Sequence, residues 1–340
     1  VAMAAAAAVS YDDYYGEYHG HKVSHLDAVL AELKRDHGSV VYLAGDSSLD
    51  NKYWFDERAP ALNGYERVLR PPQMKQDVCY WLNHEAQRRG QSHTCCINTA
   101  VEATSLNSRA FCSLLEQDEF VRDNIGPDDV LIVSVGGNDI ANEPLLLTII
   151  NLLVLSWCVP VACLESCACA CPPNLRLDLG CLGCGVPGCL TGTCCGWPLG
   201  VGYFVDLFKN RVGNYVERLV SRRKPKKVLV CMIYYLDEAK QGGWADTALS
   251  CMGYNCFPYR LQALIRTMYR LGTKMIRIEG TEVVAIPLFE TLDGKTTEDY
   301  LERVEPSPVG GRKLAVQLMD AILAPACSGS LGGSSDEESA

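Results

Sequence analysis

Basic residues are scarce in this chain of 340 residues, and their scarcity limits the classes of partner. Thirty-one Lys and Arg residues stand against 41 Asp and Glu residues, so the formal net charge is −10. The basic run "RRKPKK" at 222–227 is typical of a helix end before a strand, because cations are stabilising at a helix C-terminus. Without a surface of positive charge to neutralise phosphates, the composition argues against a nucleic-acid-binding protein.

Two long-range signals are also missing. We find no internal repeat, which argues against a solenoid or propeller. The opening residues "VAMAAAAAV" have no basic segment followed by a long apolar run, so a secretory signal is not visible. We expect residues 1–24, with the exposed stretch "HGHKVSH", to form a flexible leader rather than a metal site. The Gly/Ser-rich acidic segment 326–340 is predicted to be a disordered tail.

Long uninterrupted apolar runs are missing as well. The most apolar stretch, 144–163, contains Thr148, Asn151, Ser156 and Pro160, and it is short for a bilayer span. We expect a buried helix or a lid helix there. Contact with a membrane surface is the alternative.

What is present is a pattern of alternating strands and helices. Hydrophobic residues make up 48% of the chain, which is enough for a large core. The pattern predicts an α/β fold, a three-layer α/β/α sandwich with a central, roughly five-stranded parallel sheet. We assign this domain to 25–143 and 201–325, interrupted by an apolar and Cys-rich insertion at 144–200. The predicted strands lie at 39–44, 92–101, 128–137, 226–235 and 282–289, and the helices near 25–37, 71–88, 113–124, 204–219, 261–271 and 314–322.

Three polar clusters follow predicted strands: "GDSS" at 45–48, "NTAVEATS" at 98–105 and "GGND" at 136–139. In parallel sheets the ligand crevice lies at the carboxyl ends of the strands. A serine-type ester hydrolase needs a hydroxyl nucleophile and donors for the oxyanion. Ser47 is the candidate nucleophile, with a helix from Ser48 adding its dipole. The Asn138 side chain and the Ala103 backbone N–H are the candidate donors. Taken alone, "GDSS" favours a helix cap over a nucleophile.

In this order the clusters resemble the blocks of the SGNH or GDSL-type hydrolases, whose fold is flavodoxin-like. The resemblance implies that Ser47 is the nucleophile and that Asn138 is an oxyanion donor. It puts Ala103 where the family has a glycine, and alanine keeps the backbone donor if the local torsions allow it. Asp46 is expected to orient the loop by accepting backbone hydrogen bonds.

The fourth block departs from the family pattern. The family ends in Asp-x-x-His, whereas this chain has "ERVEPSPVGG" at 302–311 and no histidine after residue 93. The alignment puts Glu302 at the acid position and Glu305 at the histidine position. A carboxylate is ordinarily a poorer base than imidazole, but burial or the second glutamate can raise its pKa. His84 or His93 replaces the base only if the fold brings it beside Ser47.

Ten of the 18 cysteines lie between 158 and 195. Such a small, glycine-rich segment is typically stapled by disulfides or metal, and reduced thiols are the third alternative. Cys181 and Cys184, with Cys194 and Cys195, are the weak zinc candidates. Disulfides imply an oxidising compartment, whereas the missing signal slightly favours the cytoplasm, so the localisation stays open.

The sequence therefore predicts a serine ester hydrolase that forms an acyl-serine on Ser47 and needs no cofactor. Its expected partner is a small-molecule or lipid ester, and its oligomeric state stays open. The rival is a catalytically inactive protein of the same fold that binds a glycan, a lipid or a protein partner.

Overall fold

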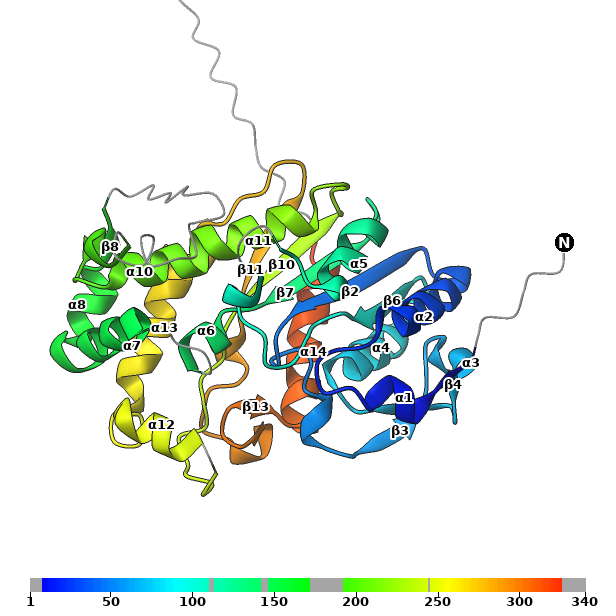
Figure 1. The fold of residues 1–340 in the computed structure, drawn as a ribbon, viewed down its shortest axis with the longest axis horizontal. Helices are drawn as coiled ribbons and strands as arrows, with labels where there is room; N and C mark the ends of the chain where they lie inside the picture. The colour runs from blue at the N-terminus through cyan, green and yellow to red at the C-terminus, as the bar shows by residue number, and fades with distance from the viewer. Residues whose placement is uncertain (1–7, 110–112, 142–145, 172–191, 244, 326–340) are drawn as a thin grey trace, which may run out of the picture.

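A parallel sheet of five strands forms the centre of the molecule (Figure 1). The computed structural model describes residues 8–109, 113–141, 146–171, 192–243 and 245–325. The strand order is β11-β10-β7-β2-β6, and every neighbouring pair is parallel. The strands are β2 (Ser39–Gly45), β6 (Thr94–Asn98), β7 (Val130–Ser134), β10 (Lys227–Met232) and β11 (Glu282–Pro287).

The sheet is buried on both faces because successive side chains of a strand point to opposite sides. In β2, Val40 and Tyr42 enter one hydrophobic core, while Val41 and Leu43 enter the other. Strands covered on both faces need apolar residues at every position, which explains the continuous apolar runs in the sequence.

Helices cover each face of the sheet. The core on one face contains side chains of α4 (Val78–Arg88) and α14 (Pro308–Leu323). The larger core contains those of α2 (Val23–Asp36), α5 (Glu116–Asn124), α11 (Val212–Leu219) and α13 (Pro258–Leu271). The predicted α/β/α sandwich with five parallel strands is thereby confirmed.

Residues 71–77 do not join the helix expected at 71–88. Strand β5 (Gln73–Lys75) pairs instead with β3 (Arg58–Pro60). The helix begins at Val78, where the Asp77 side chain caps it by accepting from the Tyr80 N–H at 2.7 Å.

The expectation of a flexible leader is wrong for residues 8–24. Strand β1 (Val9–Ser10) pairs with β4 (Leu69–Arg70), and helix α1 (Tyr11–Tyr15) follows. Tyr14 and His21 are buried and stack with their ring centroids 3.9 Å apart. Burial of these rings orders the segment despite its polar composition. Burial also holds the pKa of His21 well below its usual range. The predicted tail at 326–340 lies outside the described residues.

The apolar part of the insertion packs on α13. It forms α7 (Leu146–Leu153), the π-helical turn η3 (Val154–Cys158) and α8 (Val161–Ser166). Thr267 Oγ1 donates to the Leu164 carbonyl at 3.1 Å, and Arg266 pairs with Glu165 at 2.5 Å. Strands β8 (Cys169–Ala170) and β9 (Gly196–Trp197) then lead through α10 (Val201–Val205) and η5 (Asp206–Arg211) into α11. In the described part of the chain, no helix is long and apolar enough to cross a membrane.

The cysteines of the insertion are free thiols wherever the structure describes them. Cys194 and Cys195 make no disulfide, and the zinc candidates Cys181 and Cys184 lie outside the described residues. Among the residues that the structure covers, no group of three or more His, Cys, Asp or Glu side chains is arranged to hold a metal ion.

Short elements complete the described chain and connect the layers. They are α3 (Tyr65–Val68), α6 (Gly137–Ala141), α12 (Ala245–Cys251), β12 (Tyr300–Leu301), β13 (Glu305–Pro306), η1 (Lys52–Trp54), η2 (Asn107–Arg109), η6 (Thr273–Met275), η7 (Leu288–Glu290) and η8 (Thr297–Asp299).

A substitution of Gly45, at the end of β2, tests how closely the edge of the sheet is packed. Its φ is +141°, and a Cβ there would lie 1.8 Å from the Ser134 carbonyl oxygen. We expect Gly45→Ala to lower the free energy of unfolding by about 3 kcal/mol or more in urea titrations. Gly38→Ala is the control, because nothing lies within 4 Å of its Cβ. Equal stability of the two variants would contradict this packing.

Candidate active site

The turn after β2 holds Ser47 at the carboxyl edge of the sheet. Ser47 is 6% exposed and follows the buried Asp46. As expected, Asp46 orients the turn: its Oδ1 accepts from the Ser48 N–H at 3.1 Å and the Ser48 hydroxyl at 2.7 Å. The Ser48 hydroxyl also lies 2.6 Å from the Ser134 hydroxyl on β7. These bonds fix the backbone on both sides of the Ser47 side chain.

The helix predicted to begin near Ser48 is not formed. Residues 47–49 make a single turn, in which the Leu49 and Asp50 N–H groups donate to the Asp46 carbonyl. The helix dipole expected at Ser47 is therefore missing, and oxyanion stabilisation depends on individual donors.

The second and third sequence blocks meet beside Ser47. Asn138, in α6, donates from Nδ2 to the Thr104 carbonyl at 2.9 Å, which leaves its second N–H available. Ala103 has φ +56°, the left-handed conformation for which glycine is suited. Its N–H makes no hydrogen bond within the described part of the chain. Both predicted oxyanion donors thus lie at the same edge of the sheet.

A buried arginine joins these blocks. Arg109 donates to the Gly45 carbonyl at 2.8 Å and to the Ser105 carbonyl at 3.1 Å. Its Nε pairs with Asp118 at 3.0 Å. Because all three partners are backbone or buried groups, the guanidinium holds the Ser47 turn against the second block.

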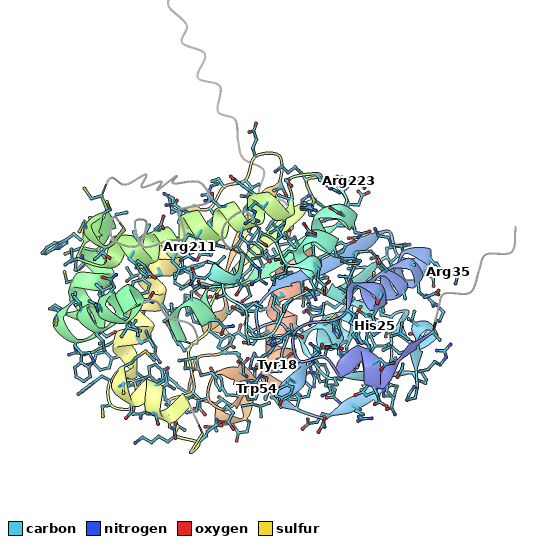
Figure 2. All side chains as sticks on the ribbon, in the orientation of Figure 1. Tyr18, His25, Arg35, Trp54, Arg211 and Arg223 are labelled. Carbon is cyan, nitrogen blue, oxygen red and sulfur yellow. The ribbon has the colours of Figure 1, made fainter. Side chains whose placement is uncertain are left out.

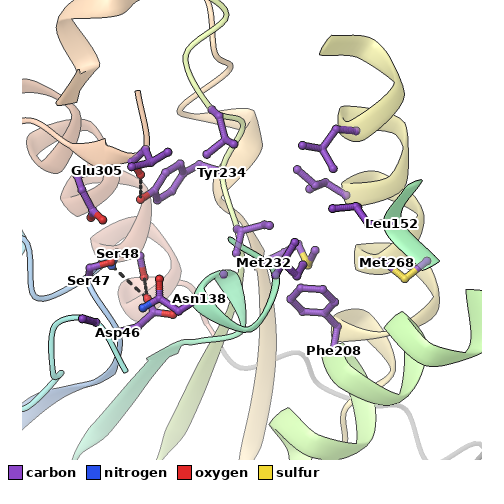
Figure 3. A pocket seen from close by; sticks show the side chains of 18 of the residues that line it. Asp46, Ser47, Ser48, Asn138, Leu152, Phe208, Met232, Tyr234, Met268 and Glu305 are labelled. Atoms are coloured by element: carbon purple, nitrogen blue, oxygen red, sulfur yellow. Dashed lines mark hydrogen bonds between the residues drawn. The ribbon is translucent and has the colours of Figure 1, made fainter. Parts of the chain in front are cut away.

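Glu305 reaches Ser47 from the fourth block. It lies in β13, which pairs with β12, and Asn51 donates from Nδ2 to the carbonyl of the following Pro306 at 2.9 Å. The Glu305 carboxyl group lies close enough to Ser47 for the Ser47 side chain to lower its pKa. Figure 3 shows this carboxyl group directed toward Ser47. A candidate nucleophile and a candidate base therefore lie next to each other.

Glu302 is not brought into this group. Glu302 and Arg303 both have positive φ, +50° and +69°, in the turn between β12 and β13. The buried Arg303 guanidinium donates to the Asp237 carbonyl and to the Asp246 carboxylate, which holds the turn away from Ser47. The Glu302 carboxylate lies against Gly243 instead. The three-residue spacing of the family pattern does not carry over, because the turn separates the two glutamates.

One cavity of about 260 Å³ is lined by Ser47, Ala103, Asn138 and Glu305 (Figure 3). Its opposite wall is apolar and includes Leu152 of the insertion, so α7 contributes to the cavity as a lid would. The apolar lining side chains are Ile140, Leu152, Phe204, Phe208, Met232, Ile233, Leu236, Met252, Leu261, Leu264, Ile265, Met268 and Val304.

Burial changes the acidity of the carboxyl groups in this cavity. It raises the pKa of Glu305 to about 8, and the negative charges of Asp46 and Asp50 add to the effect, while the nearby Ser47 side chain opposes it. Burial also raises the pKa of Asp46 to about 6, against the two hydrogen bonds from Ser48. Glu305 thus has a basicity close to that of an imidazole, whose usual pKa is about 6.5.

The lining residues that were not placed at the site from the sequence include Tyr18, Trp54 and Glu102. Tyr18 belongs to the segment expected to be a flexible leader. Glu102 directly precedes Ala103 within the second block, and a lone acid between apolar residues at a strand end was the signal that was available for it. None of the histidines in the described residues lines the cavity, so neither His84 nor His93 stands beside Ser47.

The second, third and fourth blocks converge on Ser47 at the carboxyl edge of a five-stranded parallel sheet. The chain has an α/β/α sandwich fold with this parallel sheet at its centre.

Solved structures with similar folds include a protein of Parabacteroides merdae named as a GDSL-like lipase, with 11% identity over 84% of this chain and 96% of that one, and a TM-score of 0.43. A variant of an acetyl xylan esterase from Geobacillus stearothermophilus has 12% identity over 84% and 95%, with a TM-score of 0.40. Phospholipase A1 from Streptomyces albidoflavus has 9% identity over 84% and 99%, with a TM-score of 0.39. No protein-family model and no curated protein sequence matches the chain.

Replacing Glu305 tests the cost of burying its carboxylate. The folded protein keeps this proton up to about pH 8, whereas the usual pKa is 4.5, so the wild type loses stability as the pH rises between these values. Gln cannot ionise. We expect Glu305→Gln to gain stability relative to the wild type between pH 5 and pH 9, by on the order of 1–3 kcal/mol in urea titrations. A stability difference that stays constant over this range would contradict the raised pKa.

Proposed function

We propose that this chain is a serine ester hydrolase that forms an acyl-enzyme on Ser47. The observation that carries the proposal is the cavity that Ser47, Ala103, Asn138 and Glu305 line together, with the Glu305 carboxyl group directed toward Ser47. The order of the sequence blocks, which resembles that of the SGNH or GDSL-type hydrolases, supports it.

In the first step, Ser47 Oγ attacks the ester carbonyl carbon while Glu305 takes the hydroxyl proton. The Ala103 N–H and the free N–H of the Asn138 amide donate to the oxyanion. The intermediate collapses by breaking the bond to the alcohol oxygen, and Glu305 returns its proton to that alcohol. Water then attacks the acyl-serine with Glu305 as base, which releases the carboxylic acid and restores Ser47. Every proton moves between named groups, and the proposed sequence uses no cofactor.

Glu305 suits this role because its environment raises the basicity of its carboxylate, which is ordinarily a weak base. A carboxylate with an ordinary pKa holds the Ser47 proton too weakly to remove it efficiently near neutral pH. With its pKa raised to about 8, ionised Glu305 is a stronger base, although only a minor fraction is ionised at pH 7. The raised pKa makes ionised Glu305 a stronger base and shifts the expected pH range of activity to higher pH.

The apolar wall supports an ester with an apolar acyl group. The cavity has a volume of about 260 Å³, and most of the side chains that line it are apolar. Burying each methylene contributes about 0.8 kcal/mol. We expect acyl chains of intermediate length to bind better than acetyl groups.

The outer face of α7 and η3 supports contact with a lipid surface. Ile149, Ile150, Leu153 and Trp157 are between 37% and 49% exposed there, while Leu152 of the same helix lines the cavity. An apolar surface beside the cavity favours substrates held in micelles or bilayers over dispersed ones.

The rival proposal is a binding protein with the same cavity and no turnover. The lack of an imidazole in the cavity lining, within the described residues, is the observation that favours it. Turnover and its dependence on Glu305 separate the two proposals.

Substitutions at Ser47, Glu305 and Glu302 distinguish a catalytic role from an effect on local structure. We expect Ser47→Ala and Glu305→Gln each to lower kcat/KM for para-nitrophenyl butyrate by at least roughly 1,000-fold, because each removes a reacting group. Glu302→Gln, three residues from Glu305 but turned away from the cavity, is the matched control and should stay within about threefold of the wild type. Turnover by Ser47→Ala at the wild-type rate would favour the rival proposal.

The dependence of the rate on pH reports the state of Glu305. Because the ionised form is the base, kcat/KM should rise about tenfold per pH unit below pH 8 and level off above it. Initial rates between pH 5 and pH 9.5 measure this, with the Ser47→Ala protein giving the background hydrolysis. A profile already level at pH 6 would show that Glu305 has an ordinary pKa or is not the base.

A further inference from the structure

The polar end of the cavity has a composition that the steps at Ser47 do not use. Tyr18, Trp54 and Glu102 line it together with Glu305, opposite the apolar wall. Tyr18 and Trp54, both labelled in Figure 2, come from different segments and line the same cavity. Aromatic rings joined with a buried carboxyl group form a surface that suits a polar, partly flat ligand better than an acyl chain.

Glu102 is held in place from both its backbone and its side chain. Its N–H donates to Asp50 Oδ2 at 2.9 Å, and the buried Lys52 pairs with Asp50 Oδ1 at 2.5 Å. The indole N–H of Trp54 donates to Glu102 Oε1 at 3.1 Å. The position of the second carboxyl oxygen, Oε2, is thereby determined in advance of any ligand.

That oxygen is buried without a hydrogen-bond partner in the described structure. Glu102 is 2% exposed, and its Oε2 and Oε2 of Glu305 both lack a partner. Native proteins rarely leave such atoms unsatisfied, because each costs about 1–3 kcal/mol. Both orphaned oxygens belong to residues that line the cavity, so a ligand with hydrogen-bonding groups at that end can satisfy them.

The protonation state of Glu102 limits which ligand groups can hydrogen-bond to it. Burial and the negative charge of Glu305 raise the pKa of Glu102 to about 9, so Glu102 is a neutral acid near neutral pH. A neutral carboxyl group both donates and accepts a hydrogen bond. A hydroxyl group matches it in both respects, whereas a quaternary ammonium ion has no N–H to donate and gains little from a neutral acid.

The direction of the ester follows from the two ends of the cavity. The acyl chain lies against the apolar wall formed by α7, η5 and α13, because burying methylene groups is favourable only against apolar side chains. The alcohol portion then extends toward the polar end that contains Glu102.

We propose that Glu102 is a specificity residue that hydrogen-bonds a free hydroxyl group on the alcohol portion of the substrate. The preferred substrates are then esters of polyols, of the glycerol or sugar type, rather than simple alkyl esters. This inference rests on the proposed ester hydrolase function.

Two esters that differ only in hydroxyl groups test it: glycerol monohexanoate and propyl hexanoate. We expect the wild type to favour the glycerol ester in kcat/KM by about tenfold or more, the equivalent of one net hydrogen bond. In Glu102→Leu the ratio should fall to near one. Glu102→Gln, whose amide also donates and accepts, should recover most of the preference. A purely structural role would lower both rates together and leave the ratio unchanged.

Three results would overturn the assignment. They are a wild-type ratio near one, a ratio that survives in Glu102→Leu, and a choline ester of hexanoic acid preferred over the glycerol ester. Thermal melting of each variant establishes that it is folded, and the ratio of two substrates on one protein is independent of the active fraction.

Binding to the Ser47→Ala protein separates this inference from the proposed function. Calorimetry with the same two esters measures the preference without turnover. If the wild type hydrolyses neither ester, but Ser47→Ala binds the glycerol ester about tenfold tighter and adding Glu102→Leu removes that difference, the hydrolase proposal fails and the Glu102 assignment stands. If hydrolysis occurs without preference, only the Glu102 assignment fails.

Discussion

The buried guanidinium of Arg109 is the interaction on which the candidate site depends. A charge in the core is costly unless it is fully bonded, and Arg109 bonds the Gly45 carbonyl, the Ser105 carbonyl and Asp118. Ser47 lies two residues beyond Gly45, and Ala103 lies two residues before Ser105. One buried cation therefore fixes the distance between the candidate nucleophile and an oxyanion donor, while the parallel pairing of β2 with β7 places Asn138 beside them.

Acidic groups gathered at low exposure give the cavity its chemistry. Asp46, Asp50, Glu102 and Glu305 are all buried near Ser47, and Lys52 is paired with Asp50. Desolvation by burial, with the negative charges of neighbouring carboxylates, keeps protons on Asp46, Glu102 and Glu305 to unusually high pH, which lowers stability and raises basicity at the same time. A site without imidazole can thus contain a base of comparable strength, at the cost of a smaller ionised fraction near neutral pH.

Segments outside the α/β core complete the cavity. Leu152 comes from the insertion and Tyr18 from the N-terminal segment, and each lines one end. Leu152 belongs to the segment expected to form a buried or lid helix, whereas Tyr18 belongs to a segment expected to be a flexible leader. In the proposed function, these covering segments contribute to ligand preference, whereas Ser47, Ala103 and Asn138 belong to the strand ends. This division follows from the architecture, because the strand ends are held rigidly and the covering segments are free to vary.

The sequence by itself determined the sheet, its helical layers and the strand ends that contain Ser47, Ala103 and Asn138. Apolar periodicity and strand-end polarity are local properties that follow from burial on two faces. Only the tertiary structure decided that Glu305, and not Glu302, faces Ser47, and that Glu102 joins it. Those outcomes depend on contacts between residues far apart in the chain. These are the contacts of the Arg303 turn, of the N-terminal segment and of Asp50. No local pattern encodes such contacts, because the free energy of burying a carboxyl group is set by its neighbours in space.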